Sequence, residues 1–404
     1  MISTSLAAAD NAAVVHDRVA ALDYLRAFVT VLVVAHHSVL AYHPYAPPLG
    51  SFGAENMLWG AFPIIDTRRW TGIDLFVGFN DTFFMSLMFL LSGLFVWPSL
   101  QRRSVGGFLR DRCLRLGLPF LVSAALLAPL AYYPAWLQRG GASDIGAFAQ
   151  AWLALGVWPA GPAWFLWVLL AFDALAALAW WIAPSWAAAA GRTLTSRSPA
   201  VFFGWLTAVA VAAFVPLASV IDPSSWSSFG PFFFQTSRIV LYLCFFAIGI
   251  AVGAWGTARG VLAANGALAH RWMLWPNLAV CAYFALVALF ITLLVTNAKH
   301  QPIAGLGTAT LIAFCVSCTT SSTAFLSVFL RFGNRCFAVL DSLSRNAFGI
   351  YLVHYALVSW LQLALLNLDW PGAAKGSTVF LMALVSSWAI VAALRRIPGV
   401  ARVI

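Results

Sequence analysis

Charged residues are scarce in this sequence of 404 residues, and acidic ones are scarcest. Only 9% of the residues are Asp, Glu, Lys or Arg, and Glu55 is the single glutamate. In contrast, 62% fall in the apolar class AVILMFWYC, and the mean hydropathy is +0.88. A water-soluble fold needs far more ionic groups on its surface, and the same numbers exclude disorder, collagen, a coiled coil and a disulfide scaffold. The composition therefore predicts an all-α, polytopic membrane helix bundle.

Several motifs are also missing. The sequence has no GxSxG elbow, no P-loop and no HExxH, which argues against a serine hydrolase, an NTPase and a zinc protease. Cys315 and Cys318 form a CxxC, but no second pair or nearby His completes a zinc set. We interpret all six cysteines as small buried hydrophobes and predict no metal site. The net charge of +10 forms no basic stripe on a polar face, so no nucleic-acid partner is predicted.

Long apolar segments divide the chain into spans. A helix of about 20 apolar residues crosses a bilayer core. Ten segments meet this length, and the whole chain 1–404 reads as one transmembrane domain; the segments are 21–42, 82–100, 117–137, 162–183, 201–221, 232–256, 272–296, 304–328, 346–367 and 376–394. A short amphipathic segment over 143–157 is expected to lie along the membrane surface.

The arginines and lysines predict the orientation of these spans. Most of them fall in one alternate set of connections, which favours an even number of spans with both termini in the cytoplasm. Residues 1–18 then form a cytoplasmic segment without the features of a cleavable signal, and the first span acts as its own insertion signal. Residues 43–81 form an extracytoplasmic loop, which is either functional or an interfacial cap over the bundle. The expected location is the inner membrane of the cell.

The first span carries four ionisable residues, although such groups are costly within a bilayer. They are Asp23, Arg26, His36 and His37. Arg26 and His37 are eleven residues apart, so on an α-helix they point within about 20° of each other and lie roughly 16 Å apart along the axis. Asp23 adjoins Arg26 and can pair with it. His36 points about 100° away from His37, toward a different neighbour.

This polar face has two interpretations. Arg26 can bind a phosphate near the cytoplasmic end of the first span, while His37 exchanges a proton deeper in the membrane. Alternatively, Arg26 only reaches the inner headgroups and His37 is satisfied by a neighbouring helix. Arg112 and Arg115 are three residues apart at the cytoplasmic entrance to the third span. They are either a topology signal or part of a polyphosphate clamp with Arg26.

Further polar residues lie inside predicted spans. His354 in the ninth span and Asp173 in the fourth are each either hydrogen-bond partners between helices or participants in chemistry. Ser92 and Gly93 close an aromatic stretch, and the plainer interpretation of this pair is close helix packing.

Five short motifs, in order along the chain, resemble the membrane-bound acyltransferase 3 family. The family pattern is an Arg, ten residues and a His on the first helix, often with an Asp three residues before the Arg. The matching segments are Leu22-Asp-Tyr-Leu-Arg26 with His37, the aromatic stretch from Asn80 to Ser92-Gly93, Arg112-Cys-Leu-Arg115 before a proline, Gly161-Pro-Ala-Trp164-Phe-Leu166, and Tyr351-Leu-Val-His354.

The resemblance implies a ten-helix membrane enzyme that moves an acyl group, acetyl or succinyl, from cytoplasmic acyl-CoA to a hydroxyl, commonly of a glycan. The donor is a substrate, so no permanently bound cofactor is expected, and the other partners are membrane lipids. The implied roles are catalytic for His37, as the base, and for Asp23; donor-binding for Arg26, Arg112 and Arg115; and pocket-forming for Ser92, Trp164, His354 and Asp173.

Two points of the mechanism stay open at this stage. A covalent acyl-histidine and direct transfer are both compatible with the sequence. The base also needs an orienting partner. Asp23 lies too far along the helix for this task, which leaves four candidates: Asp74, Asp81, Glu55 and Asp173.

Two other classes of function are compatible with the polar face. One is a secondary transporter that uses Asp23, Arg26 and His37 as a proton or anion relay. The other is a non-catalytic lipid or assembly scaffold. The sequence shows no internal repeat of the kind found in many transporters, and a relay gives Arg112 and Arg115 no role. The oligomeric state is not predicted.

Overall fold

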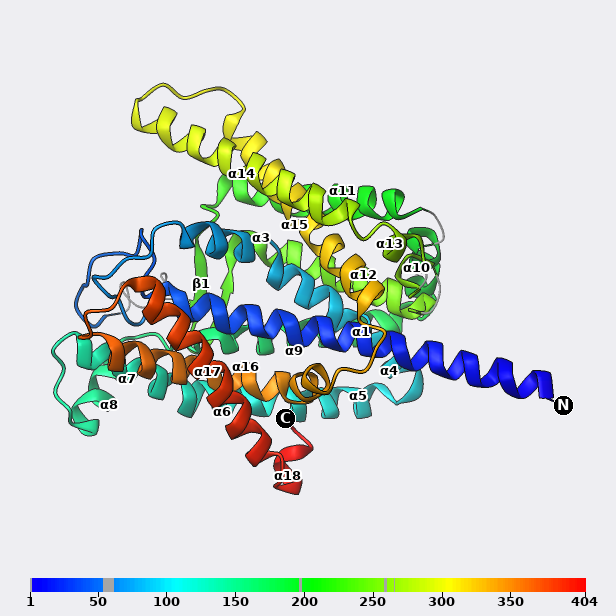
Figure 1. Ribbon diagram of the computed structural model, residues 1–404, viewed down its shortest axis with the longest axis horizontal. Helices are drawn as coiled ribbons and strands as arrows, with labels where there is room; N and C mark the ends of the chain where they lie inside the picture. The colour runs from blue at the N-terminus through cyan, green and yellow to red at the C-terminus, as the bar shows by residue number, and fades with distance from the viewer. Residues whose placement is uncertain (1, 54–61, 196–197, 258–259, 265) are drawn as a thin grey trace.

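The fold is an elongated bundle of long helices (Figure 1). The computed structural model describes residues 2–53, 62–195, 198–257, 260–264 and 266–404, with side chains from residue 20 onward. Within these ranges, ten helices are long and apolar enough to cross a membrane. The predicted all-α, multi-pass fold is therefore confirmed, and each of the ten spans overlaps the apolar segment that predicted it, with shifted bounds.

The spanning helices follow one another along the chain. They are α1 (Ile2–Leu40, apolar from Ala20), α3 (Ile73–Gly93) continued by α4 (Val96–Arg102), α5 (Val105–Arg112) continued through α6 (Leu118–Val122) to α7 (Ala128–Gln138), α9 (Trp164–Ile182) after the 3-10 turn η3 (Gly161–Ala163), α11 (Pro199–Val220), α12 (Ile239–Trp255) after η4 (Thr236–Arg238), α14 (Leu274–Ala298), α15 (Leu306–Phe332), α16 (Ala338–Leu365) and α17 (Gly372–Leu394).

Shorter helices lie between the spans and after the last one. They are α8 (Ile145–Ala154), α10 (Trp186–Thr195), η5 (Gly260–Leu262), α13 (Ala267–His270) and α18 (Pro398–Ala401). The predicted segment 143–157 is thus helical in its centre, and α8 exposes Ile145 and Leu153 while it buries Phe148 and Trp152.

The second span begins nine residues earlier than predicted, at Ile73, so the expected loop 43–81 ends at residue 72. Asp74 and Asp81 made this stretch look like a loop. Asp74 lies in the first helical turn, where a carboxylate interacts favourably with the helix dipole. Asp81 forms an ion pair with Arg238 at 2.7 Å, which compensates its charge within the span.

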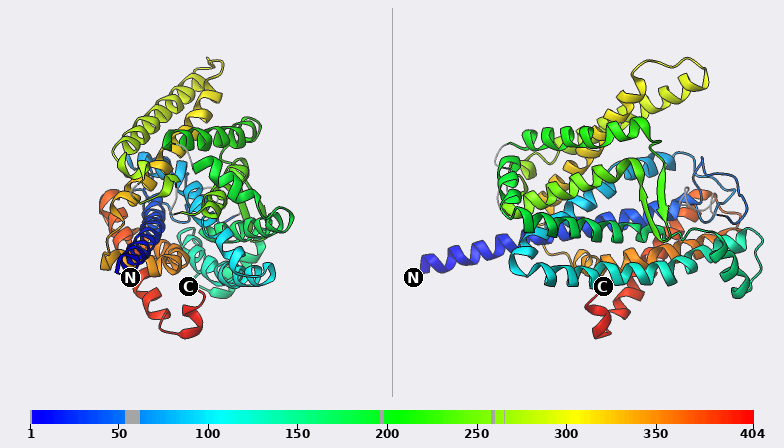
Figure 2. Two further views of the ribbon diagram at one scale, coloured as in Figure 1. Left: turned by 90° about the vertical axis from the view of Figure 1, so that its right-hand side faces the viewer. Right: turned by 180° about the vertical axis from the view of Figure 1, so that it is seen from behind.

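The sixth span was predicted as helix from residue 232, but residues 226–235 form a β-hairpin instead. Strands β1 (Trp226–Phe229) and β2 (Phe232–Gln235) pair antiparallel, with Trp226 opposite Gln235. Gly230 has φ of +57° in the turn, a conformation that glycine adopts without strain. The hairpin lies at the same end of the bundle as the segment that follows α1 (Figures 1 and 2).

The third span contains two π-helical turns, η1 (Cys113–Gly117) and η2 (Ser123–Leu127). Each turn is closed by a bond from residue i to residue i−5, Leu118 to Cys113 and Ala128 to Ser123. A proline directly follows each closing residue, and it has no amide hydrogen to continue the α-helical ladder. The Trp158 indole donates to the Ala124 carbonyl within η2 at 2.6 Å. The widened helix changes which residues share a face.

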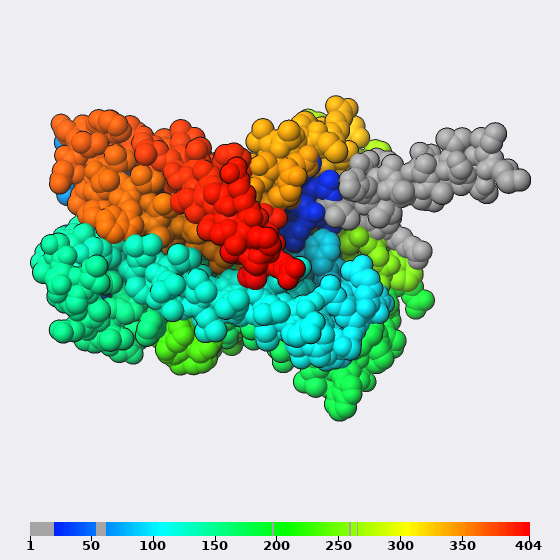
Figure 3. All heavy atoms as spheres, turned by 90° about the horizontal axis from the view of Figure 1, so that it is seen from below, coloured from blue at the N-terminus to red at the C-terminus, as the bar shows by residue number. Residues whose placement is uncertain are grey.

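Helices α1 and α16 run parallel and in register. Tyr24 donates to Asp341, and the His37 and His354 rings meet at 3.2 Å; both pairs are separated by 317 residues in sequence. The Gln362 amide also donates to the carbonyls of His37 and Ser38. The first and ninth spans therefore point the same way, as alternating spans require. On the face shown in Figure 3, α16 and α17 lie beside the chain from α5 to α7.

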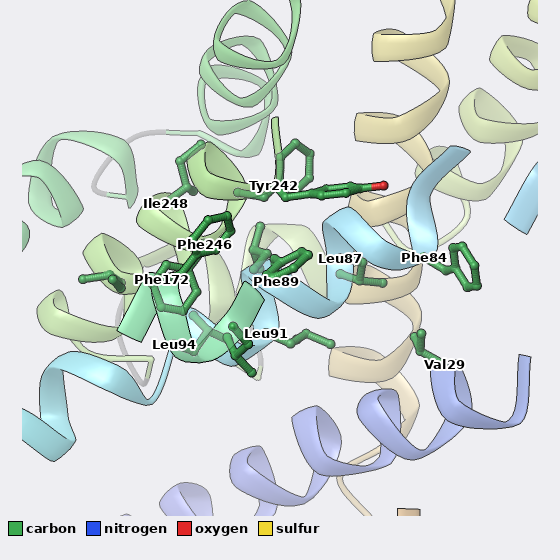
Figure 4. Packing of buried hydrophobic residues seen from close by; sticks show 14 of the residues in the cluster. Val29, Phe84, Leu87, Phe89, Leu91, Leu94, Phe172, Tyr242, Phe246 and Ile248 are labelled. Atoms are coloured by element: carbon green, nitrogen blue, oxygen red, sulfur yellow. The ribbon is translucent and has the colours of Figure 1, made fainter. Parts of the chain in front are cut away.

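Glycine contacts bring α3 and α12 close together. A Cβ on Gly93 would lie 2.2 Å from the Phe246 carbonyl oxygen, and one on Gly249 would lie 2.1 Å from that of Leu90. The main apolar core surrounds this crossing, with Phe89, Phe172, Phe246 and Tyr242 at its centre (Figure 4). The packing interpretation of Gly93 fits this geometry.

The cysteines are less uniform than predicted. Cys315 and Cys318 are buried and Cys244 is half-buried, but Cys113, Cys281 and Cys336 are exposed. The prediction of six buried cysteines is therefore wrong for these three. Cys281 lies on α14, a very apolar span with little of its surface covered by protein. The apolar sequence around Cys281 therefore indicates a surface that faces lipid and not the protein core.

A buried ion pair anchors the segment after α1. The Lys375 amine donates to Asp66 Oδ2 at 2.7 Å and to the Leu366 carbonyl at 3.0 Å, and both charged side chains are at most 1% exposed. The Asp66 amide in turn donates to the Ala41 carbonyl at 3.0 Å. These bonds tie residues 62–72 to the ends of α1 and α17.

We expect Lys375→Met to destabilise the protein by about 3–5 kcal/mol, because it leaves the Asp66 carboxylate buried without a counter-charge. The thermal midpoint in detergent, followed by intrinsic fluorescence, measures this loss. The matched control is Asp369→Asn, which breaks the exposed Arg68–Asp369 pair and should cost at most about 1 kcal/mol. Equal midpoints for Lys375→Met and wild type would show that the buried pair does not stabilise the fold.

Candidate active site

A cavity of about 160 Å³ lies between α1, α3, α7, α9, α12, α16 and the hairpin. Its walls are mostly aromatic, with a few polar groups. The lining residues that matter for chemistry are His36, His37, Asp81, Tyr132, Trp164, Trp226, Gln235, Tyr242, Tyr351 and Tyr355. A largely apolar cavity with a few convergent polar groups is the usual form of a small-molecule site.

Three hydrogen-bond contacts indicate the protonation pattern of the His37 and His354 rings. His354 Nδ1 lies 2.7 Å from the Tyr351 carbonyl oxygen, which only accepts, so Nδ1 carries the proton and Nε2 is an acceptor. That Nε2 lies 3.2 Å from His37 Nδ1, which also lies 2.9 Å from the Val33 carbonyl. His37 Nδ1 therefore donates, and its Nε2 is left unprotonated. This is the arrangement of a histidine prepared to act as a base.

The Gly161–Leu166 motif forms one wall of the cavity. Gly161 has φ of +57°, and a Cβ there would lie 3.1 Å from the Tyr355 ring. The Pro162 carbonyl accepts a hydrogen bond from the Tyr351 hydroxyl. Trp164 lines the cavity and packs edge-on against Trp226 of the hairpin, with ring centres 5.5 Å apart. The motif thus connects α9 to α16 beside His37.

Asp81 forms an ion pair with Arg238, a partner that the sequence did not predict. Arg238 donates to both the Asp81 carboxylate and the Asp81 backbone carbonyl, at 2.7 and 2.8 Å. The sequence patterns assign Arg238 no role in a site. Its position directly before a long apolar helix was the available signal, since a charge there needs a partner.

His36 lines the same cavity, although its position predicted a different neighbour from that of His37. The two rings lie 5.4 Å apart and edge to face, and the His36 ring also contacts Phe84. His36 is 8% exposed, and within the described residues its buried Nδ1 has no hydrogen-bond partner.

The predicted donor-binding arginines lie elsewhere. Arg26 pairs with Asp23, as the sequence predicted, and lies 5.1 Å from the centre of the Phe95 ring. Arg112 Nε lies 3.3 Å from the buried carboxylate of Asp173, and Arg115 is exposed within η1. The helix widens after Arg112, and the two arginines have different surroundings: Arg112 forms an ion pair with Asp173 of α9, whereas Arg115 is exposed.

The arginines do not line the cavity that holds His37. The cavity does reach Val33, one helical turn from His37 toward Arg26. The remaining seven residues of α1 between Val33 and Arg26 correspond to about 10 Å. Helices α4 and α5 lie at the end of the bundle opposite the hairpin (Figure 1). Arg26 and the cavity are thus arranged along the axis of α1.

The other predicted site residues divide clearly. Trp164 and His354 belong to the His37 site. Trp164 lines the cavity, whereas His354 does not line it but forms a hydrogen bond with the His37 ring. Ser92 does not line the cavity, and Asp173 is placed to orient Arg112 rather than His37. Of the four carboxylates considered as orienting partners, Asp74, Asp81 and Asp173 make no hydrogen bond to His37, whose ring partner is His354; Glu55 lies outside the described residues.

Over the ranges that the structure describes, no three His, Cys, Asp or Glu side chains are grouped as a metal site requires. Comparison with protein families matches residues 19–394 to the acyltransferase domain that defines the acyltransferase 3 family. Searches of curated proteins and of solved structures give no match. The family match covers all ten spans, the His37 cavity and the arginines. The chain therefore belongs to the acyltransferase 3 family and is a multi-pass membrane acyltransferase.

Proposed function

We propose that this protein transfers an acetyl or succinyl group from cytoplasmic acyl-CoA to a hydroxyl of a glycan at the inner membrane. The observation that carries the proposal is the hydrogen-bonded His37–His354 pair, which leaves His37 Nε2 free to accept a proton beside an aromatic cavity. Aromatic walls such as Trp164 and Trp226 suit the apolar faces of a sugar ring, while Gln235 and the tyrosine hydroxyls suit its hydroxyls.

The proposed donor site is the basic end of the bundle. Arg26, Arg112 and Arg115 bind the CoA phosphates there, and Asp173 holds the Arg112 side chain through its Nε. Arginine suits this task because its terminal nitrogens bind phosphate oxygens in pairs. The flexible arm of CoA then extends along α1 toward Val33 and His37. Asp23 holds Arg26 in place and takes no part in the proton transfer.

The proposed reaction is a direct transfer. His37 Nε2 takes the proton of the acceptor hydroxyl, and the oxygen attacks the thioester carbonyl. The new C–O bond replaces the C–S bond, and the proton passes from His37 to the departing CoA thiolate. The products are an O-acyl ester and free CoA. His354 stabilises the His37 tautomer that accepts the proton, the task that a carboxylate performs in a Ser-His-Asp triad.

Acyl transfer by purified protein tests the proposal. The protein in lipid nanodiscs is mixed with acetyl-CoA or succinyl-CoA and a glycan preparation, and both free thiol and glycan-bound ester are measured. We expect equal amounts of thiol and ester. Counterflow of a labelled solute in proteoliposomes, without any covalent product, would instead support the secondary-transporter alternative.

A further inference from the structure

We propose that the acyl subsite beside His37 selects an uncharged short acyl group against a dicarboxylic one, and that Asp81 and Arg238 determine this selection. This inference rests on the proposed function and narrows it from acetyl or succinyl to acetyl. The reason is the charge of the cavity wall.

No lysine or arginine is among the described residues that line the cavity. The lining includes one carboxylate, Asp81, together with two histidines, tyrosines, tryptophans and apolar side chains. A succinyl group bound at His37 would place its free carboxylate in this wall without a cationic partner, and near a second carboxylate. Burial of such an unpaired charge is strongly unfavourable, whereas an acetyl methyl group has no such cost.

Arg238 is the nearby cation that could compensate the charge of a succinyl carboxylate, but it is already paired with Asp81. One terminal nitrogen of Arg238 donates to the Asp81 carboxylate at 2.7 Å and the other to the Asp81 carbonyl at 2.8 Å. Its guanidinium carbon lies 4.7 Å from the centre of the Phe314 ring. The side chain is 9% exposed and does not line the cavity. Asp81 thus removes a positive charge from the subsite.

A polar atom nearby suits a neutral ligand. His36 Nδ1 is buried without a hydrogen-bond partner among the described residues, and its ring lines the cavity next to His37. A buried polar atom without a partner is costly, and a carbonyl or hydroxyl group of the bound substrates would remove that cost. The wall therefore offers polar contacts for neutral groups but no partner for an anion.

The matched substrates are butanoyl-CoA and succinyl-CoA, which have acyl chains of four carbons and differ in the terminal carboxylate. For the wild-type protein in nanodiscs, we expect kcat/KM for succinyl-CoA to be lower than for butanoyl-CoA by on the order of 100-fold. Asp81→Asn keeps the side-chain shape and releases the Arg238 charge, so we expect the ratio to shift at least about tenfold toward succinyl. In Asp81→Asn with Arg238→Gln, this shift should disappear.

Three results would overturn the inference while the proposed function stands. The first is equal use of succinyl and butanoyl groups by the wild-type protein. The second is equal rejection of both groups, which would indicate selection by size. The third is an unchanged ratio of the two kcat/KM values in folded Asp81→Asn. If the variants do not fold, the wild-type ratio alone decides. Failure to transfer any acyl group from CoA, acetyl included, would instead overturn the proposed function and this inference together.

Discussion

Replacement of His37 by alanine is expected to reduce acyl transfer by about 10²–10⁴-fold, because the variant has no base to take the acceptor proton. Acyl-CoA binding should be preserved, since the predicted phosphate contacts lie about three helical turns away. Initial rates of thiol release and equilibrium binding of labelled acyl-CoA, both measured in nanodiscs, separate the two effects.

His36→Ala is the matched control for this prediction. The two histidines are neighbours in sequence and line the same cavity, but only His37 bonds to the His354 ring. We therefore expect a much smaller loss for His36→Ala, about tenfold. Full activity in His37→Ala with a large loss in His36→Ala would exchange the roles of the two residues. Full activity in both variants would show that neither histidine is the base.

Loss of the Arg112 side chain is expected to weaken the donor site selectively. Removal of Arg112 alone would leave the Asp173 carboxylate buried and unpaired, so the informative variant is Arg112→Ala combined with Asp173→Asn. We expect the apparent KM for acyl-CoA to rise about 10- to 100-fold, as for the loss of a charge-assisted hydrogen bond to phosphate. The KM for the acceptor should change by no more than about twofold.

Asp173→Asn alone is the control, because it keeps the Arg112 charge and removes only its carboxylate partner. We expect a smaller rise in the donor KM, with unchanged acceptor KM. Steady-state kinetics with each substrate varied in turn provide both constants. Equal rises in the two constants for the double variant would indicate that Arg112 serves the topology of the third span rather than the donor.

The parts of the fold that depend on local pattern could be predicted from the sequence. Long apolar runs fix ten spans because a bilayer requires them, and the spacing of Asp23 and Arg26 places both on one helical surface. The family resemblance also predicted that Trp164 and His354 belong to the pocket of His37. In each case, neighbours along the chain or a family pattern carried the necessary information.

Contacts between distant segments could not be predicted in this way. The partner of Asp81 lies 157 residues away, and the ring partner of His37 lies 317 residues away. Without Arg238 in view, Asp81 appeared to belong to a loop, and the second span was predicted to start too late. Without the parallel register of α1 and α16, a carboxylate rather than His354 was the natural expectation for orienting the base.

The hairpin and the π-helical turns show a third limit. The aromatic residues before Ile239 fit either a membrane helix or a strand, and only the turn at Gly230 distinguishes them. In the third span, Pro119 widens the preceding turn, so a spacing of three no longer brings Arg112 and Arg115 onto one face. Helical geometry applied to the sequence assumes α-helix throughout, and here that assumption fails.

Mass spectrometry of cell-surface and periplasmic glycans tests the central claim most directly, in cells without the protein and in the same cells supplied with wild type or with His37→Ala. The account predicts an acyl ester on a glycan hydroxyl that is present with wild type and absent in the other two samples. A glycan profile that is identical in all three would contradict it.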